Sequence, residues 1–235
     1  MSEIPIIPVA RLDLRFEPVA WRFAVERRDA IDAHFARLRV DKPAMFNGRV
    51  LLLRHGEIAD GMLSGAYLET DFASFIAWRD WGFPDKAMRN CFPMAALRSH
   101  DGAFLLGVMG SHTATAGQVY FPAGTPDPND IVGESVDLGA GVMRELAEET
   151  GLGPADATAQ PGWFATPLGQ RLALMKVVEA RQDADTLRRR ILAFLAADAQ
   201  PELADIEVVR SVDDLHSAMP RYVSTFLADR LGSRP

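Results

Sequence analysis

The stretch Arg144-Glu145-Leu146-Ala147-Glu148-Glu149-Thr150-Gly151-Leu152 carries the strongest signal in this chain. In a helix, which advances about 100° per residue, Glu145, Glu148 and Glu149 fall on one side as i, i+3 and i+4 neighbours. Three carboxylates on one side of a helix repel one another. That side is therefore either fully solvated or occupied by a cation, and a hard divalent metal such as Mg²⁺ takes oxygen ligands of this kind.

The residues around the three glutamates favour a helix with one buried side. Leu138, Val142 and Leu146 form an apolar stripe at helical spacing. Gly151 stands where a left-handed C-terminal cap is wanted. The pattern predicts an amphipathic helix that ends at this glycine.

The order R-E-L-A-E-E-T-G-L resembles the second half of the motif of the Nudix hydrolases, G-x5-E-x7-R-E-U-x-E-E-x-G-U, in which U is a bulky apolar residue. The resemblance implies an α/β fold, a Nudix-type α/β/α sandwich with a mixed sheet. It implies hydrolysis of a nucleoside diphosphate linked to another moiety. The catalytic residues that it implies are Arg144, Glu145, Glu148 and Glu149. The three glutamates would bind Mg²⁺, with Mn²⁺ as an alternative, and the arginine would steady a motif glutamate through a bidentate pair.

The first half of the motif departs from the family pattern. Gly124 resembles the opening glycine and is a candidate substrate contact, but it lies 20 residues before the motif arginine, where the family has 14. The position of the early acid is occupied by Val136, so Glu134 or Asp137 would have to replace it. We interpret residues 125–133, which are rich in proline, aspartate and asparagine, as an enlarged loop.

A further metal-binding acid from a distant loop is typical of the resembled family. Glu202, Glu179 and Glu207 are candidates, and each has a solvated surface acid as its alternative reading. Glu202 is our first choice because it follows a proline in a predicted loop. His112, in a small polar segment before a strand, is a candidate contact for phosphate or sugar, with a plain loop histidine as the alternative.

Composition limits the class of protein. The chain has 235 residues, of which 48% are hydrophobic and 24% charged, as in globular proteins with a substantial core. Its net charge of -7 gives no general attraction to nucleic acids or anionic membranes. The first ten residues do not read as a signal peptide, and no apolar run is long enough to span a membrane, so we expect a cytoplasmic protein. The single cysteine, Cys91, is expected to be buried and inert.

Two parts are distinguished along the chain. An N-terminal α+β segment over residues 1–89, packed on the core, is predicted to contain strands at 12–16, 50–53 and 66–69 and helices at 21–39 and 72–78. A Nudix hydrolase domain over residues 90–235 is predicted to contain, besides the motif helix, strands at 95–97, 103–109, 118–121, 163–166, 172–178 and 206–209 and helices at 186–197 and 220–231, the last capped by Gly232.

The N-terminal segment holds several large aromatic residues. Trp78, Trp81 and Phe83 belong in a core or at a domain junction, with stacking on a base as the alternative. The stretches Phe46-Asn47-Gly48 and Thr70-Asp71-Phe72 are similar in placement to elements ahead of the Nudix domain in UDP-glucose-hydrolysing members. We therefore expect this segment to shape the substrate pocket.

These observations lead to one functional expectation with two alternatives. The expected activity is Mg²⁺-dependent hydrolysis of the diphosphate linkage of a nucleotide sugar, such as a UDP-sugar. A pyrophosphatase acting on ADP-ribose, NADH or coenzyme A-type dinucleotides is the first alternative, and a non-catalytic Nudix-like nucleotide-binding module is the second. The expected partner is a small-molecule nucleotide, and a homodimer is the assembly we consider.

Overall fold

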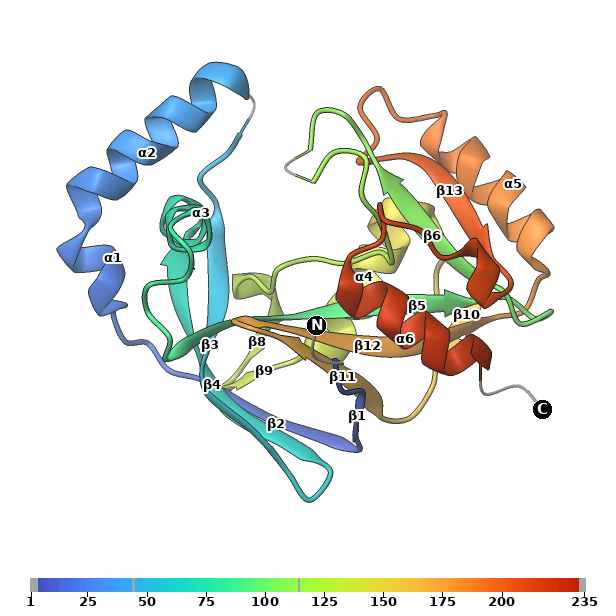
Figure 1. Ribbon diagram of the computed structural model, residues 1–235, viewed down its shortest axis with the longest axis horizontal. Helices are drawn as coiled ribbons and strands as arrows, with labels where there is room; N and C mark the ends of the chain where they lie inside the picture. The colour runs from blue at the N-terminus through green and yellow to red at the C-terminus, as the bar shows by residue number, and fades with distance from the viewer. Residues whose placement is uncertain (1–3, 44, 114, 233–235) are drawn as a thin grey trace.

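The computed structural model describes residues 4–43, 45–113 and 115–232 (Figure 1). The strands are β1 (Ile7–Val9), β2 (Arg11–Phe16), β3 (Arg49–Ala59), β4 (Met62–Asp71), β5 (Met88–Arg98), β6 (Phe104–Met109), β7 (Val119–Tyr120), β8 (Ile131–Val132), β9 (Ser135–Val136), β10 (Ala157–Ala159), β11 (Trp163–Leu168), β12 (Arg171–Ala180) and β13 (Leu203–Val209). The α-helices are α1 (Arg22–Glu26), α2 (Arg28–Asp41), α3 (Phe72–Asp80), α4 (Leu138–Thr150), α5 (Ala184–Leu195) and α6 (Arg221–Gly232), and two short 3-10 helices are η1 (Pro128–Asp130) and η2 (Val212–Asp214).

Strand β5 joins the parts of one mixed sheet. It runs parallel to β12 and antiparallel to β3 and β6. The main path of the sheet is β1-β11-β12-β5-β3-β4-β2-β9-β8, and β6, β7, β10 and β13 pair off this path. Strands from both ends of the sequence therefore meet in the same sheet.

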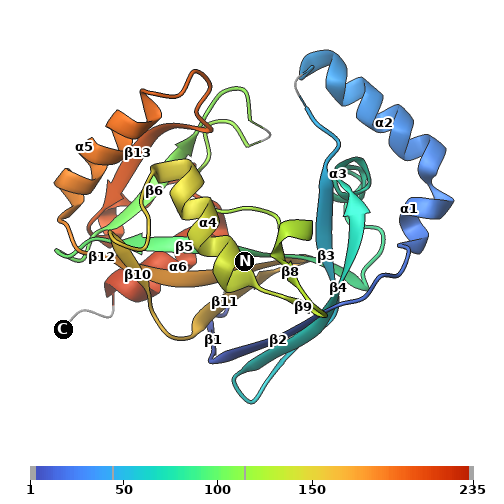
Figure 2. The same ribbon diagram turned by 180° about the vertical axis from the view of Figure 1, so that it is seen from behind.

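Helices cover both faces of the sheet around β5. Alternate side chains of a strand point to opposite faces, and here Ala95 and Leu97 enter the core under α4 and α5, whereas Met94 and Ala96 enter the core under α6. Helix α6 crosses the sheet on the near side in Figure 1, and α4 lies on the near side in the reverse view of Figure 2. The expected α/β/α sandwich with a mixed sheet is confirmed.

The first hairpin is longer than the sequence pattern indicates. Strands expected at 50–53 and 66–69 extend to a tight turn at Asp60 and Gly61, whose φ angles are 48° and 70°. Two successive positive φ angles are typical of the type I′ turns that join antiparallel strands. The Asp-Gly pair was the local signal for this turn.

The helix expected over residues 21–39 is wrong in one respect, because it is two helices. Helix α1 ends and α2 begins around Arg27, whose φ and ψ of -112° and 15° leave the helical region. The break lets Trp21 pack in one cluster with α3, while Ile31 and Phe35 pack in another. A single straight helix would present these residues along one line.

The segment expected as an irregular enlarged loop, residues 125–133, is structured. It contains η1 and leads into the hairpin β8–β9, and β9 pairs with β2 at Arg15 and Ser135. Backbone hydrogen bonds from Leu51 N to Pro126 O (2.7 Å) and from Phe16 N to Glu134 O (2.8 Å) add further connections. The insertion in the motif is thus held by the N-terminal strands.

The strands expected at 95–97 and 103–109 are β5 and β6, and the two pair over a short length only. Strands β5 and β6 pair only at Arg98 and Phe104, after which β6 turns away to pair with β13 and β7. Gly232, expected as a cap, is the last residue of α6. The other expected elements are present, although β5 begins at Met88 and not near residue 95, and β1, β8, β9 and β10 were not expected.

Burial is confirmed for Trp78 and Cys91, whereas Trp81, expected in a core or at a junction, is 37% exposed. Trp78 is fully buried in the cluster that α3 forms with β3 and β4, and its indole Nε1 donates to the Asp85 carbonyl. Cys91 is buried in the core, and burial raises the pKa of its thiol to about 12, which keeps it in the unreactive protonated form. Within the described ranges, none of the helices combines the length and the apolarity that crossing a membrane requires.

Candidate active site

Helix α4 has the C-terminal cap and the buried stripe that the sequence predicts. Its N-terminus is capped by the Asp137 carboxylate, which accepts from the backbone N–H groups of Gly139 and Ala140. Its C-terminus ends at Gly151, whose φ of 70° is the left-handed cap conformation. The buried stripe of Leu138, Val142 and Leu146 fixes the rotation of the helix against the sheet.

The three glutamates differ sharply in burial. Glu149 is 7% exposed, and its Oε1 accepts a hydrogen bond of 3.0 Å from the backbone N–H of Ala123. The side chain of Glu145 is 18% exposed, whereas that of Glu148 is 61% exposed. The helix therefore directs Glu145 and Glu149 inward and leaves Glu148 largely in solvent.

Gly124 lies directly against the Glu145 carboxylate. A Cβ atom added at this glycine would stand 2.5 Å from Cδ and Oε1 of Glu145, far inside van der Waals contact. The absence of a side chain at Gly124 is thus what allows the Glu145 carboxylate its place. The expectation that this glycine belongs to the site agrees with its position, although its contact with a substrate stays a prediction.

Gly124→Ala is expected to separate activity from stability. The displaced atoms are the end of a flexible side chain, so Glu145 can move aside and the fold should be retained. The carboxylate would then be out of position, and turnover should fall by about tenfold or more. Thermal melting and turnover measured side by side test this, and a variant with unchanged turnover would contradict it.

Arg144 organises the acids around it. Its Nη1 lies 2.7 Å from Oε1 of Glu145 and 3.6 Å from Oε2 of Glu148, and its Nη2 lies 2.9 Å from Oδ1 of Asp130. Asp130 is only 4% exposed and accepts a second hydrogen bond from the backbone N–H of Asp127. The arginine therefore joins the helix to the structured insertion.

Asp130 is the site residue that the sequence reasoning missed. Of the two acids considered as replacements for the early motif acid, Glu134 is exposed and Asp137 caps α4. The available signal was the pair Asp127 and Asp130, which form a capping box around η1 with a proline at the first helical position. A carboxylate fixed in this way is suited to hold an arginine.

Glu202 is the distant acid that the fold brings to α4. It precedes β13, and its backbone carbonyl accepts from Gly110 N at 2.8 Å. Burial raises its pKa, an effect opposed by the nearby His112. The other two candidates lie elsewhere: Glu179 stands beside Arg98, and Glu207 bonds to His216 at 2.8 Å.

The buried acids raise one another's pKa. Burial, followed by repulsion from Glu202, raises the pKa of Glu149 to about 9. Burial also raises the pKa of Glu145 to about 7, with the Arg144 guanidinium opposing the shift and Glu148 adding to it. Charge of one sign is thus concentrated where water cannot screen it.

Two carboxylates, from Glu145 on α4 and from Glu202 before β13, border a cavity of about 730 Å³. Glu145 and Glu202 line it together with side chains from α3, β5, the start of β12 and the start of α6. Thr113 and Thr115 also line it, whereas His112 is exposed beside Glu202 and is not among the lining residues. Substrate contact by His112 stays a prediction.

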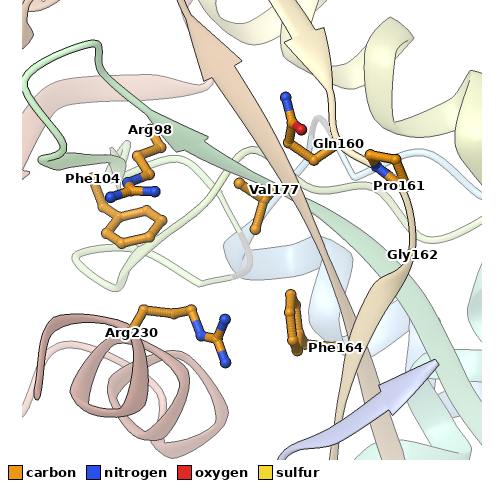
Figure 3. A pocket seen from close by; sticks show the side chains of 8 residues that line it. All are labelled: Arg98, Phe104, Gln160, Pro161, Gly162, Phe164, Val177 and Arg230. Atoms are coloured by element: carbon orange, nitrogen blue, oxygen red, sulfur yellow. The ribbon is translucent and has the colours of Figure 1, made fainter. Parts of the chain in front are cut away.

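A second cavity of about 270 Å³ shares no lining residue with the first and is shown in Figure 3. It lies between α6 and the sheet, where the guanidinium of Arg230 stands 4.2 Å from the ring centre of Phe164. Arg98, on its opposite side, faces Glu179 at 3.5 Å. It contains none of the acids of the predicted motif.

The donor chemistry of the site fits a hard divalent cation. Glu145, Glu149 and Glu202 supply carboxylate oxygens, the ligands that Mg²⁺ prefers, and a cation among them would relieve the repulsion that raises their pKa values. Among the described residues, no three acid, histidine or cysteine side chains are already gathered in ligand positions. The fit is therefore one of charge and donor type.

Comparison with known proteins finds similar solved structures but no matching family or curated protein. No family model matches the chain, and no curated protein matches it. Among solved structures, the MutT protein from Methanosarcina mazei Go1 is 23% identical over 62% of this chain and 96% of its own, with a TM-score of 0.40. A Nudix hydrolase from M. smegmatis, RenU, is 15% identical over 62% and 86%, with a TM-score of 0.39. The Bacillus subtilis pyrophosphohydrolase BsRppH is 14% identical over 54% and 65%, with a TM-score of 0.31.

At these sequence identities and TM-scores the activities of the similar structures cannot be assigned to this chain, because one fold supports many functions. We therefore argue the function from the side chains of the site.

Proposed function

We propose that this protein is a pyrophosphatase that hydrolyses the diphosphate linkage of a nucleoside diphosphate linked to another moiety. The observation that carries the proposal is the gathering of three acids: Glu145 and Glu202 line one cavity, and Glu149 is buried where both of them raise its pKa. Buried carboxylates that repel one another are a feature of sites that bind a cation. A diphosphate is the substrate whose charge such a cation would mask.

Glu145, Glu149 and Glu202 are the residues that would hold Mg²⁺ or Mn²⁺, with the exposed Glu148 as a further ligand. When bound, the cation would neutralise phosphate oxygens and acidify a bound water. The chain's own groups keep the acids in place: Arg144 holds Glu145, and the Ala123 N–H holds Glu149. A carboxylate of this set would accept the proton of the attacking water.

The shape of the cavity supports a substrate larger than a diphosphate. Its volume of about 730 Å³ is within the usual range for pockets that enclose small organic ligands. The two N-terminal stretches that resemble UDP-glucose-hydrolysing members meet beside it, because Asn47 Oδ1 accepts from Ala73 N and Gly48 O accepts from Phe72 N. Phe72 lines the cavity. A nucleotide sugar, such as a UDP-sugar, is thus our leading substrate class.

A substrate panel tests the proposal. With millimolar Mg²⁺, UDP-sugars are expected to be cleaved faster than ADP-ribose, NADH or coenzyme A, and excess chelator should abolish cleavage. Released phosphate after a phosphatase step is the measurement. Cleavage that persists in chelator would contradict the metal role, and preference for ADP-ribose would replace the substrate class.

A non-catalytic nucleotide-binding module is the competing function. It would bind members of the same panel without turnover in any metal. The retention of Glu145, Glu148 and Glu149 together argues for catalysis, because a module that only binds has no need of three acids beside an anionic ligand. A cytoplasmic location and a homodimer stay predictions.

A further inference from the structure

The cavity of about 730 Å³ is lined by arginines as well as by acids. Its acidic lining residues are Glu145 and Glu202, which belong to the site described above. Its basic lining residues are Arg79 on α3, Arg171 at the start of β12 and Arg221 at the start of α6. The sequence pattern assigned none of the three arginines a role.

The cavity follows one face of β5. Asn90, Phe92 and Met94 are alternate residues of this strand, so their side chains leave the sheet on the same face, and all three line the cavity. Met94 bridges to Ala123, whose N–H binds a motif glutamate, and so marks the acidic end. Arg171 pairs in register with Asn90, which is four residues from Met94 and so about 13 Å away along an extended strand. Arg171 therefore starts from the end of the cavity opposite to the acids.

The guanidinium of Arg171 has an aromatic neighbour but no acidic partner. Among the described residues no carboxylate forms an ion pair with it, whereas Arg79 pairs with the adjacent Asp80 at 2.9 Å. The guanidinium lies 5.1 Å from the ring centre of Phe83. Burial raises the pKa of the Tyr222 hydroxyl and the positive charge of Arg171 opposes this shift, so the two groups are close to each other. A half-buried cation without a counter-ion attracts an anion, because water screens its charge only in part.

The ring beside Arg171 is firmly held by the N-terminal segment. Phe83 has a φ of 60°, a conformation that is rare for a bulky residue, and its backbone N–H donates to the Trp78 carbonyl at 2.8 Å. Its ring packs edge-on against the buried indole of Trp78, with ring centres 4.7 Å apart. The adjacent Gln170 donates to two backbone carbonyls beside the start of β5. Arg171 is thus positioned before a ligand arrives, which reduces the entropy that binding costs.

The position of Arg171 determines which part of a ligand it meets. If the diphosphate binds at the acids, as the proposed function requires, one of the moieties attached to the diphosphate extends along β5 towards Arg171. A guanidinium donates hydrogen bonds and accepts none, and its planar fork matches the two oxygens of a carboxylate or phosphate group. A hydroxyl group of a neutral sugar offers a single oxygen without charge. The arginine therefore favours an anionic group at this end of the cavity.

We propose that Arg171 binds a second anionic group of the ligand, remote from the diphosphate, and is a specificity-determining residue of this cavity. The proposal rests on the proposed function for the orientation of the ligand. Two sources supply the required chemistry: the carboxylate of a sugar acid in a nucleotide sugar, and a phosphate on the ribose of the nucleoside. A ligand with a neutral group at this place leaves the guanidinium without a counter-ion and binds less tightly.

Two pairs of ligands that contain no diphosphate linkage test the proposal. Glucuronate 1-phosphate has a carboxylate where glucose 1-phosphate has a neutral hydroxymethyl group, and adenosine 3′,5′-bisphosphate has one phosphate more than AMP. In calorimetric titrations of the full chain with Mg²⁺, the more anionic member of at least one pair is expected to bind about tenfold or more tightly than its partner. The pair that shows this preference identifies the source of the second anion.

Two substitutions separate the charge of Arg171 from its packing. Arg171→Met keeps an unbranched apolar stem and removes the charge, so the preference should fall towards one while the binding of glucose 1-phosphate and AMP stays nearly unchanged. Arg171→Lys keeps the charge but loses the planar fork, so it should retain part of the preference. A purely structural role of Arg171 would not produce this difference between two variants with the same melting temperature.

A matched control is Arg189→Met, on the exposed surface of α5 and outside the cavity, which should keep the full preference. Equal binding within both pairs by the unaltered protein, or a full preference retained in Arg171→Met, would overturn the proposal. An equal loss of affinity for all four ligands in Arg171→Met would also overturn it, because the arginine would then bind the phosphate that all four share.

The same titrations distinguish this proposal from the proposed function. The expected preference without turnover of any nucleoside diphosphate derivative would refute the proposed hydrolysis and leave the anion subsite supported. Turnover of nucleotide sugars together with equal binding within both pairs would refute the subsite and leave the hydrolysis supported.

Discussion

Glu149→Gln is expected to stabilise the metal-free protein while it reduces turnover by about a hundredfold or more. Turnover falls because a charge that would bind the cation is lost, and several kcal/mol of transition-state stabilisation depend on such a charge. Stability rises because Glu149 is buried beside Glu202 and is penalised whenever it ionises. A residue that serves activity at a cost in stability is expected to show both effects when it is replaced: higher stability and lower turnover.

The pH dependence gives the sign of the stability effect. The folded pKa of about 9 lies above the unfolded value, so the folded state binds more protons between the two. The free energy of unfolding therefore falls as pH rises from about 4.5 towards 9. In chelator at pH 8, the melting temperature of Glu149→Gln should exceed that of the original protein by on the order of 5 °C.

The control for this experiment is Glu179→Gln, an exposed acid beside Arg98 that lies outside the cavity. It should leave both turnover and the pH dependence of melting unchanged. Addition of Mg²⁺ should raise the melting temperature of the original protein and not that of Glu149→Gln, because a bound cation removes the repulsion. Equal turnover in Glu149→Gln and the original protein would remove this residue from the site.

Asp130→Ala is expected to have the second largest effect, on both stability and activity. The substitution removes the buried partner of the Arg144 guanidinium and the acceptor for the Asp127 N–H. Loss of one partner of a buried ion pair costs about 3 kcal/mol. Arg144 would then be free to shift away from Glu145, and turnover should fall by about tenfold or more. Chemical unfolding and turnover at saturating substrate are the measurements.

Glu134→Gln separates the role of Asp130 from a general effect of negative charge. Glu134 directly follows the insertion and is exposed, so its substitution should change the free energy of unfolding by no more than about 0.5 kcal/mol. Similar losses in the two variants would mean that the insertion, and not the ion pair of Asp130, is what the protein needs.

The parts of the site that follow from local sequence signals were predictable. Helix α4 was defined by its apolar stripe and by the glycine at its end, and both signals act within a few residues. The candidate role of Glu202 came from its place in a predicted loop. Its approach to Glu149 depends on the pairing of β13 with β6, which no local pattern encodes.

Other parts depend on contacts between distant residues and could not be read from the chain. Asp130 lies six residues from the position at which the family pattern has its early acid, so spacing did not indicate its pairing with Arg144. The break at Arg27 is likewise set by packing and not by a proline or glycine.

The hydrogen bonds between the insertion and the N-terminal strands have a consequence for protein engineering. Asp130 lies between Pro126, whose carbonyl accepts a hydrogen bond from Leu51 N, and Ser135, which pairs with Arg15 across two strands. A chimaera that exchanges the N-terminal strands of this chain for those of another protein would lose both of these contacts. Asp130 would then be held less firmly, and so would its ion pair with Arg144. Residues 126–136 must therefore be transferred together with the N-terminal strands that they contact. The unit to be exchanged consists of two segments that are separate in the sequence.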